Sequence, residues 1–266
     1  FGLIKKFLIK KKKIIFDNAY LGKKDYQNDV DNLLKGTKIN YKDYNSKFIA
    51  KVLSQGKVIG FYSGYSEYGP RALGNRSILA DPRRKNMRNY INKHVKHREL
   101  FRPFAPAVLQ EDSKKFFGIE NSPYMLRVSK TIRHQKIPAV VHVDKTARVQ
   151  TVSKKNNSKF YDLIKEFKQI TNIPCVLNTS FNDKGEPIVE KPIDAMITFL
   201  KTKLDYLVLE NNIICKKDIS KKKEKFILKG LIKKRSIQIN IENKKTKRLL
   251  FKKLNKNEFT KKKIVE

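Results

Sequence analysis

The run Glu67–Ser77 limits most strongly what this chain can fold into, because it sets two glycines and a proline around two arginines, an asparagine and a serine. Glycine and proline weaken a strand ladder and charged side chains resist burial, so the run is not predicted to be a buried strand. A solvated surface loop has little use for so many residues that restrict backbone shape. The pattern is typical of a loop that directs backbone N–H and guanidinium groups at one anion, and we expect it to bind phosphate.

The chain of 266 residues has room for one or two domains, and its 39% of hydrophobic residues can supply a globular core. Its formal net charge of +36 has two interpretations. One is a polyanionic partner, such as nucleic acid or an acidic membrane surface. The other is an AT-rich genome that favours lysine codons. The lysines are scattered and are not interleaved with aromatic residues, which favours the second interpretation and argues against nucleic acid as a partner.

No apolar run in the sequence is long enough to span a bilayer, and the first residues do not follow the order of a signal peptide. The first residue is phenylalanine, so we expect that the sequence begins inside a longer polypeptide or that the gene is split. The distant cysteines Cys175 and Cys215 predict reduced thiols of a cytoplasmic protein. The four histidines form no metal-ligand pattern, so we expect no metal site held by this chain alone.

Helical and strand-like patterns alternate along the chain and predict an α/β fold. The two prolines of 99–106 argue against both a helix and a central strand, so we expect a rigid loop there. Beyond Lys216 the lysine-rich tail is compatible with a hairpin, a basic arm or partial disorder. Helices are expected over 25–36, 45–55, from Asp81–Pro82 onward, 158–171 and 192–201, and strands over 58–62, 78–80, 123–129, 138–143, 147–152, 174–177, 206–209 and 213–215.

Four polar clusters follow predicted strands, where the functional loops of α/β folds lie. Arginines offer planar forks to phosphate oxygens, lysines offer point charges, and Asn, Ser and Thr add neutral donors. No Ser/His/Asp set is evident and neither cysteine has a neighbouring base, which argues against nucleophilic catalysis. The clusters predict binding of a phosphate-bearing small molecule, with catalysis by positioning and electrostatics. They are Arg71, Asn75, Arg76 and Ser77; Lys96, Arg98 and Arg102; Asp144, Thr146, Arg148 and Gln150; and Asn178, Thr179, Ser180 and Asn182.

Several long motifs, taken together and in order, resemble the O-carbamoyltransferase family, which includes the nodulation-factor, tobramycin and cephalosporin carbamoyltransferases. The main motif is Glu67–Arg83, and the resemblance covers roughly residues 18–217. The other motifs are Arg98–Glu99, Phe101–Leu109, Ser122–Met125, Pro138–Val140, His142–Asp144, Thr146–Val152, Leu177–Asn182 and Gly185–Val189.

The resemblance implies that this region is the C-terminal half of such an enzyme. That half is a YrdC-like α/β domain with a twisted mixed sheet and flanking helices, followed here by a basic C-terminal extension. The resemblance also implies that carbamoyl phosphate and ATP, with Mg²⁺ in the ATP complex, give carbamoyl-adenylate in this half. In an N-terminal half, related to the ATPases of tRNA threonylcarbamoyl modification, the carbamoyl group would pass to a hydroxyl of a sugar or natural-product acceptor.

The same motifs carry family roles to individual residues of this chain. Arg71, Lys96 and Arg148 are the expected catalytic contacts to carbamoyl phosphate and the nucleotide phosphates. The expected substrate- and nucleotide-binding residues are Asn178 and Ser180 by motif, and Asn75, Arg76, Arg102 and Asn182 by chemistry and position.

We expect residues 1–45 to be the end of, or a linker from, a missing N-terminal domain, 46–217 the YrdC-like domain, and 218–266 a lysine-rich tail.

Two departures from the family pattern qualify these roles, and the first is that the N-terminal half is missing. The metal-binding His/Asp set of the family's N-terminal half has no counterpart, so we expect an N-terminal domain or subunit as a partner. Lys145 also stands where the family has glycine; a positive φ there would cost roughly 1 kcal/mol. Alternatively, its side chain adds positive charge near the site.

Two other functions stay open at this point. The chain could be a basic, YrdC-like module that binds RNA, in which case binding would fall steeply with salt. It could instead be a non-catalytic subunit that docks to a separate N-terminal half.

Overall fold

The computed structural model describes residues 18–22 and 26–262. The expectation of a solvated strand or chain end over 1–16 lies outside the described residues, and so does Asp25, the expected cap of the first helix.

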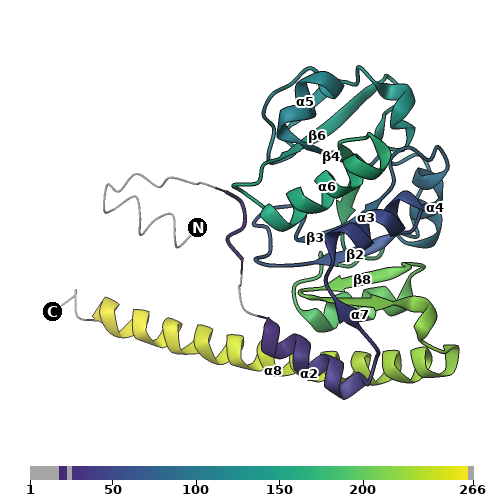
Figure 1. The fold of residues 1–266 in the computed structure, drawn as a ribbon. Coiled ribbons are helices and arrows are strands. Elements are labelled where there is room, and N and C mark those ends of the chain that lie inside the picture. The colour runs from purple at the N-terminus through teal and green to yellow at the C-terminus, as the bar shows by residue number, and fades with distance from the viewer. Residues whose placement is uncertain (1–17, 23–25, 263–266) are drawn as a thin grey trace.

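Among the described residues, nine strands form a mixed sheet in the order β1-β9-β8-β2-β3-β7-β4-β6-β5 (Figure 1). The pairs β2–β8 and β4–β6 are parallel, and the other neighbours are antiparallel. The predicted α/β fold with a mixed sheet and flanking helices is therefore confirmed. The strands are β1 Lys42–Asp43, β2 Ile59–Tyr62, β3 Arg76–Ala80, β4 Ala105–Leu109, β5 Arg127–Lys130, β6 Thr146–Val152, β7 Cys175–Ser180, β8 Tyr206–Leu209 and β9 Asn212–Cys215.

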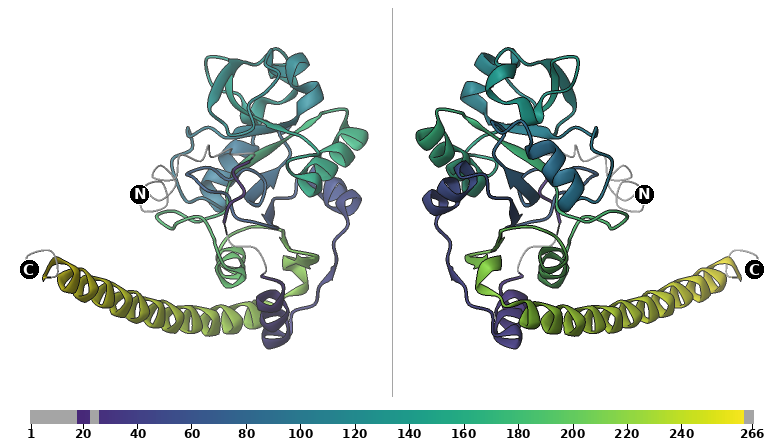
Figure 2. Two further views of the ribbon diagram at one scale, coloured as in Figure 1. Left: turned by 90° about the vertical axis from the view of Figure 1, so that its left-hand side faces the viewer. Right: turned by 90° about the vertical axis from the view of Figure 1, so that its right-hand side faces the viewer.

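Helices cover both faces of this sheet. Helices α3 and α6 lie on one face, and α4 and α7 lie on the other (Figures 1 and 2). In α6 an apolar stripe at helical spacing, Phe160, Leu163, Ile164 and Phe167, is buried against the strands. The helices are α2 Gln27–Thr37, α3 Ser46–Ser54, α4 Met87–His94, α5 Gln110–Phe117, α6 Ser158–Thr171, α7 Pro192–Lys201 and α8 Lys221–Lys262, with the short 3₁₀ helices η1 His134–Lys136, η2 Pro138–Val140 and η3 Lys216–Asp218.

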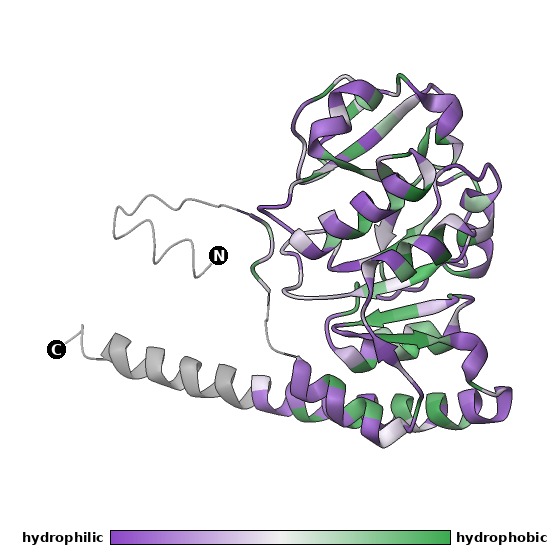
Figure 3. Cartoon of the chain, in the orientation of Figure 1, coloured by the Kyte–Doolittle hydropathy of each residue, from purple (hydrophilic) through white to green (hydrophobic). Residues whose placement is uncertain are grey.

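The lysine-rich tail is helical. Helix α8 first packs beside α2 and α7, where Ile227 and Leu231 are buried, and then runs away from the body (Figures 1 and 2). Green apolar positions lie along the part of α8 that passes under α2 (Figure 3). The hairpin alternative for this tail is wrong, because Lys221–Lys262 form one helix, in which Ile227 and Leu231 are buried, instead of two paired strands.

Three further local expectations are wrong. Asp81–Pro82 does not start a helix, because the buried Asp81 carboxylate accepts from the guanidinium and the backbone N–H of Arg83, and α4 begins only at Met87. The expected strand at 138–143 is absent, because Pro138–Val140 form the 3₁₀ helix η2 and residues 141–143 are irregular. Ala105 and Pro106 do not belong to a loop, because they begin β4, a central strand of the sheet.

Lys145 has a φ of 61°, in the left-handed region, as the family glycine implied. The strained backbone expected from this substitution is therefore confirmed. Within the described part of the chain, the helices are too short or too polar to cross a membrane.

Gly74 provides a test of how the loop before β3 packs. Its φ is 111°, and a Cβ built there would lie 2.2 Å from Cδ1 of the buried Phe160 ring. We expect Gly74→Ala to lower the free energy of unfolding by at least about 2 kcal/mol, because backbone strain and overpacking add. Urea denaturation measures this change.

Gly185→Ala is the matched control, because Gly185 also has a positive φ, of 73°, but a Cβ there meets no atom within 4 Å. The free energy of unfolding of this variant should fall by only about 1 kcal/mol, because the new side chain strains the backbone. Equal losses in the two variants would show that the Phe160 contact does not limit residue 74.

Candidate functional site

The strand register brings distant segments to one edge of the sheet. Asn178 on β7 faces Ala105 on β4, and the pairing of β4 with β6 brings Arg148 to the same end. Ser77 of β3 faces Ser180 of β7, so the loop that precedes β3 also arrives at this edge. The polar clusters predicted from the sequence therefore meet because β7 runs antiparallel to both of its neighbours.

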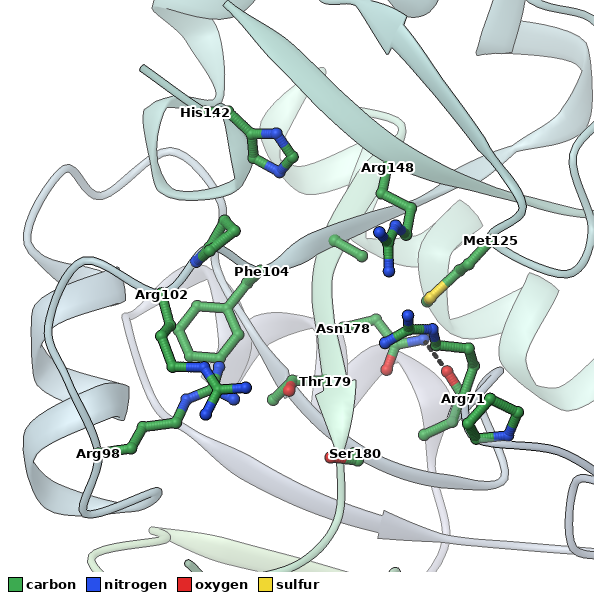
Figure 4. Close-up of a pocket in the computed structure, with 14 residues that line it drawn as sticks. Arg71, Arg98, Arg102, Phe104, Met125, His142, Arg148, Asn178, Thr179 and Ser180 are labelled. Carbon is green, nitrogen blue, oxygen red and sulfur yellow. Dashed lines mark hydrogen bonds between the residues drawn. The ribbon is translucent and has the colours of Figure 1, made fainter. Parts of the chain in front are cut away.

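A pocket of about 370 Å³ opens at this edge (Figure 4). This volume suits a small ligand. Four arginines from three segments point into it, and none of its lining residues in the described chain carries a carboxylate. The lining residues are Pro70, Arg71, Ala72, Arg98, Arg102, Pro103, Phe104, Ala105, Met125, His142, Arg148, Asn178, Thr179 and Ser180.

The arginines of this pocket repel one another. Partial burial and the charge of Arg148 lower the pKa of Arg71. Burial and the charge of Arg102 lower the pKa of Arg98 to about 10, although Glu99 opposes the shift. Arg98 is held in place because its Nε donates to Asn92 Oδ1 at 2.8 Å and its guanidinium lies 4.9 Å from the centre of the Phe104 ring. An anion in the pocket would relieve this repulsion.

One carboxylate shapes the loop that carries Arg71. Oε1 of Glu67 accepts hydrogen bonds from the backbone N–H of Leu73 and Asn75, each at 2.7 Å, and of Arg76 at 3.2 Å. Burial raises the pKa of Glu67, and the backbone donors oppose that rise. The loop closes around this oxygen, and Arg71 and Ala72 reach the pocket.

Buried amides fix the floor of the pocket. Asn178 Nδ2 donates to Gln150 Oε1 at 2.8 Å and to Ala72 O at 3.2 Å. Gln150 Nε2 donates in turn to Leu73 O at 2.7 Å. Strands β6 and β7 are thus joined to the loop before β3 through side-chain amides, and Asn178 has a fixed orientation.

Lys96 supports the pocket from behind. Its Nζ donates to the backbone oxygens of Ser180 at 2.9 Å and Asn182 at 2.8 Å, and it also bonds Oδ1 of Asn182. Burial and the charges of Arg98 and Arg102 lower the pKa of Lys96 to about 7, with Asp183 opposing. Ser180 lines the pocket, whereas Lys96 and Asn182 lie outside the lining and hold the end of β7.

Two further expected binding residues, Asn75 and Arg76, also lie outside the pocket lining. Arg76 is completely buried, because its Nη1 donates to backbone oxygens of the preceding loop and its guanidinium lies 3.7 Å from the centre of the Tyr62 ring. Asn75 donates to Tyr65 O and accepts from Asn157 Nδ2. Both side chains stabilise the loop.

The structure brings Arg71, Arg102, Arg148, Asn178 and Ser180, which are all expected site residues, together in the pocket. It also adds lining residues to which the family motifs gave no role, although Arg98 and Thr179 belong to the predicted polar clusters. The sequence signal for Arg98 is its place beside Lys96 in one polar cluster. Met125 and His142 lie in the family motifs Ser122–Met125 and His142–Asp144, but neither residue had been given a role. The added lining residues include Arg98, Phe104, Met125, His142 and Thr179.

Metal-ligating side chains do not gather in the part of the chain that the structure describes, where no three His, Cys, Asp or Glu residues come together. Cys175 and Cys215 are both free thiols, and burial raises the pKa of Cys175.

Residues 50–216 match the family described as the carbamoyltransferase C-terminus. This match covers more than half of the chain, and the chain belongs to that family. The resemblance found in its motifs is therefore confirmed.

Two curated relatives and one solved structure are similar to parts of this chain. Nodulation protein NolO of Bradyrhizobium diazoefficiens is 49% identical over 175 residues, which cover 63% of this chain and 32% of that protein. An uncharacterized protein of Synechocystis is 38% identical over 227 residues, which cover 74% of this chain and 37% of the relative. The chain thus spans about a third of the length of these curated relatives. Full-length HypF in its phosphate- and nucleotide-bound form is a solved structure with a TM-score of 0.46 and 18% identity, and the match covers 64% of this chain and 25% of HypF.

The lowered pKa of Lys96 makes stability depend on pH. In the folded chain this pKa is about 7, against 10.5 for a solvated lysine, so between these values the unfolded chain binds more protons than the folded chain. The free energy of unfolding should therefore rise with pH across this range. We expect Lys96→Met to lose that part of the rise, as measured by urea denaturation at several pH values between about 7 and 10.5.

Lys165→Met, on the exposed face of α6, is the control and should keep the slope of the unchanged protein. If Lys96→Met also keeps that slope, Lys96 does not change its charge in this range.

Proposed function

We propose that this domain binds carbamoyl phosphate and ATP in the pocket between Arg71 and Arg102 and forms carbamoyl-adenylate there. The observation that carries the proposal is a pocket with four guanidinium groups and no carboxylate among its described lining residues. Such a pocket fits a ligand with several phosphate oxygens, because each guanidinium can donate two parallel hydrogen bonds. Membership of the carbamoyltransferase family supports carbamoyl phosphate as one of the ligands.

The arginines stand in two pairs on opposite sides of the pocket, Arg98 with Arg102 and Arg71 with Arg148 (Figure 4). In the proposed reaction, water cleaves carbamoyl phosphate to carbamate and orthophosphate. A carbamate oxygen then attacks the α-phosphorus of ATP, and pyrophosphate leaves. Two separated pairs of cations suit two phosphate-bearing substrates, and they would stabilise the charge that develops on each leaving group.

Mg²⁺ would enter as part of the ATP complex. The lining residues do not fit a metal held by the protein, because no carboxylate is among them in the described chain. Nucleotide phosphates and water would therefore be the ligands of Mg²⁺.

The acceptor hydroxyl would bind to a further part of the enzyme. The chain spans about a third of the length of its curated relatives, so an N-terminal domain or subunit is the proposed partner in the transfer step. A sugar or a natural product is the proposed class of acceptor.

Calorimetry with ATP and with carbamoyl phosphate tests the proposal. Arg71→Ala and Arg148→Ala should each weaken binding by at least about tenfold, because each removes a charge-assisted contact worth about 1.5–3 kcal/mol. Release of pyrophosphate from ATP plus carbamoyl phosphate should fall in the same variants.

Arg127→Ala is the matched control, because Arg127 is exposed on β5 and does not line the pocket. If the unchanged chain binds neither ligand, or if Arg71→Ala binds both as well as Arg127→Ala does, the proposal fails. Strong binding of RNA that falls steeply with salt would support the RNA-binding alternative instead.

A further inference from the structure

A tight turn presents His142 to the pocket. The backbone N–H of His142 donates to Thr146 O at 2.7 Å, and that of Lys145 donates to His142 O at 3.1 Å. Lys145, at a φ of 61°, closes the turn in the left-handed region. The strained residue therefore brings Thr146 next to the His142 ring.

The turn also fixes which ring nitrogen of His142 carries the proton. The Thr146 hydroxyl donates to Asp144 Oδ1 at 2.7 Å, and this uses its single hydrogen. The same Oγ1 lies 3.1 Å from His142 Nδ1, so it can only accept a hydrogen bond there. Nδ1 must therefore hold a hydrogen. Asp144 acts on the ring through Thr146, and both are positioning residues.

Burial and the charges of Arg148 and Arg88 lower the pKa of His142 against the opposing charge of Asp144, which favours the neutral ring. With its one hydrogen on Nδ1, the neutral ring has its lone pair on Nε2. Figure 4 shows the ring directed into the pocket above Arg148. His142 thus offers a hydrogen-bond acceptor among arginines that can only donate.

Asn178 offers a second acceptor. Its Nδ2 is bonded to Gln150 and Ala72, so its Oδ1 cannot exchange places with the amide nitrogen without losing both bonds. This Oδ1 is buried and has no hydrogen-bond partner within the described chain. A buried acceptor without a partner costs free energy until a donor reaches it.

We propose that His142 and Asn178 select ligands that carry both an anionic group and an NH₂ group on a planar carbon, by accepting hydrogen bonds from that NH₂. The proposal rests on the proposed function, whose two ligands each carry one such group. These are the carbamoyl amide and the amino group of adenine. An acyl phosphate without an NH₂ group brings no N–H donor to either acceptor, so it leaves both acceptors unpaired.

Two ligand pairs test the proposal by calorimetry on the full chain. Acetyl phosphate replaces the carbamoyl NH₂ by a methyl group, and purine riboside triphosphate lacks the adenine amino group. We expect the unchanged protein to bind the amino ligand of at least one pair about tenfold more tightly than its isostere, as when a buried polar group is left unpaired. The pair that shows the preference identifies the donor.

Variants assign the preference to the two acceptors. His142→Phe and Asn178→Leu should bring the affinity ratio of that pair close to one, because the affinity for the amino ligand falls more than that for its isostere. Thr146→Val keeps the imidazole but frees its tautomer, so it should lower the ratio even if His142→Phe does not fold. Arg127→Ala should leave the ratio unchanged.

Equal affinities within both pairs in the unchanged protein would overturn this inference and leave phosphate binding intact. A ratio that survives in His142→Phe, Asn178→Leu and Thr146→Val would also overturn it. If none of the four compounds binds, both this inference and the proposed function fail.

Discussion

The pocket depends on a single buried oxygen, Oε1 of Glu67. A carboxylate is costly to bury unless donors satisfy it, and here three backbone N–H groups of its own loop do so. Because the loop folds around this oxygen, the carbonyls of Ala72 and Leu73 meet the amides of Asn178 and Gln150. The same oxygen therefore determines both the position of Arg71 and the contact between the loop and the sheet.

Several residues in and around the pocket lower the stability of the folded domain. Its arginines lack carboxylate partners in the lining, the ammonium of Lys96 is buried, and Lys145 occupies a backbone region that favours glycine. Each feature would be removed if stability alone determined the sequence. The rest of the domain offsets them with a continuous core in which α6 and α7 cover opposite faces of the sheet.

The sequence predicted elements well where one local signal acts without competition. The helices at 158–171 and 192–201 appear as α6 and α7, where the Asn157 side chain accepts from the backbone N–H of Phe160 and Pro192 is the first residue of α7. The prediction of a helix that starts at Asp81–Pro82 was wrong, because Arg83 competes for the carboxylate that would cap it. Arg71 and Arg148 could be placed in one site from their motifs. Arg76 could not, because its partner Tyr62 becomes its neighbour only when β2 pairs with β3.

The contact between Gly74 and Phe160 has a consequence for how such sequences can change. The ring of Phe160, in the first turn of α6, occupies the volume in which residue 74 would place a Cβ. A side chain at 74 would therefore require a smaller residue at 160 and would still strain the backbone at this positive φ, so the two positions constrain each other. For the same reason, the loop could be transplanted into another protein only together with the start of this helix.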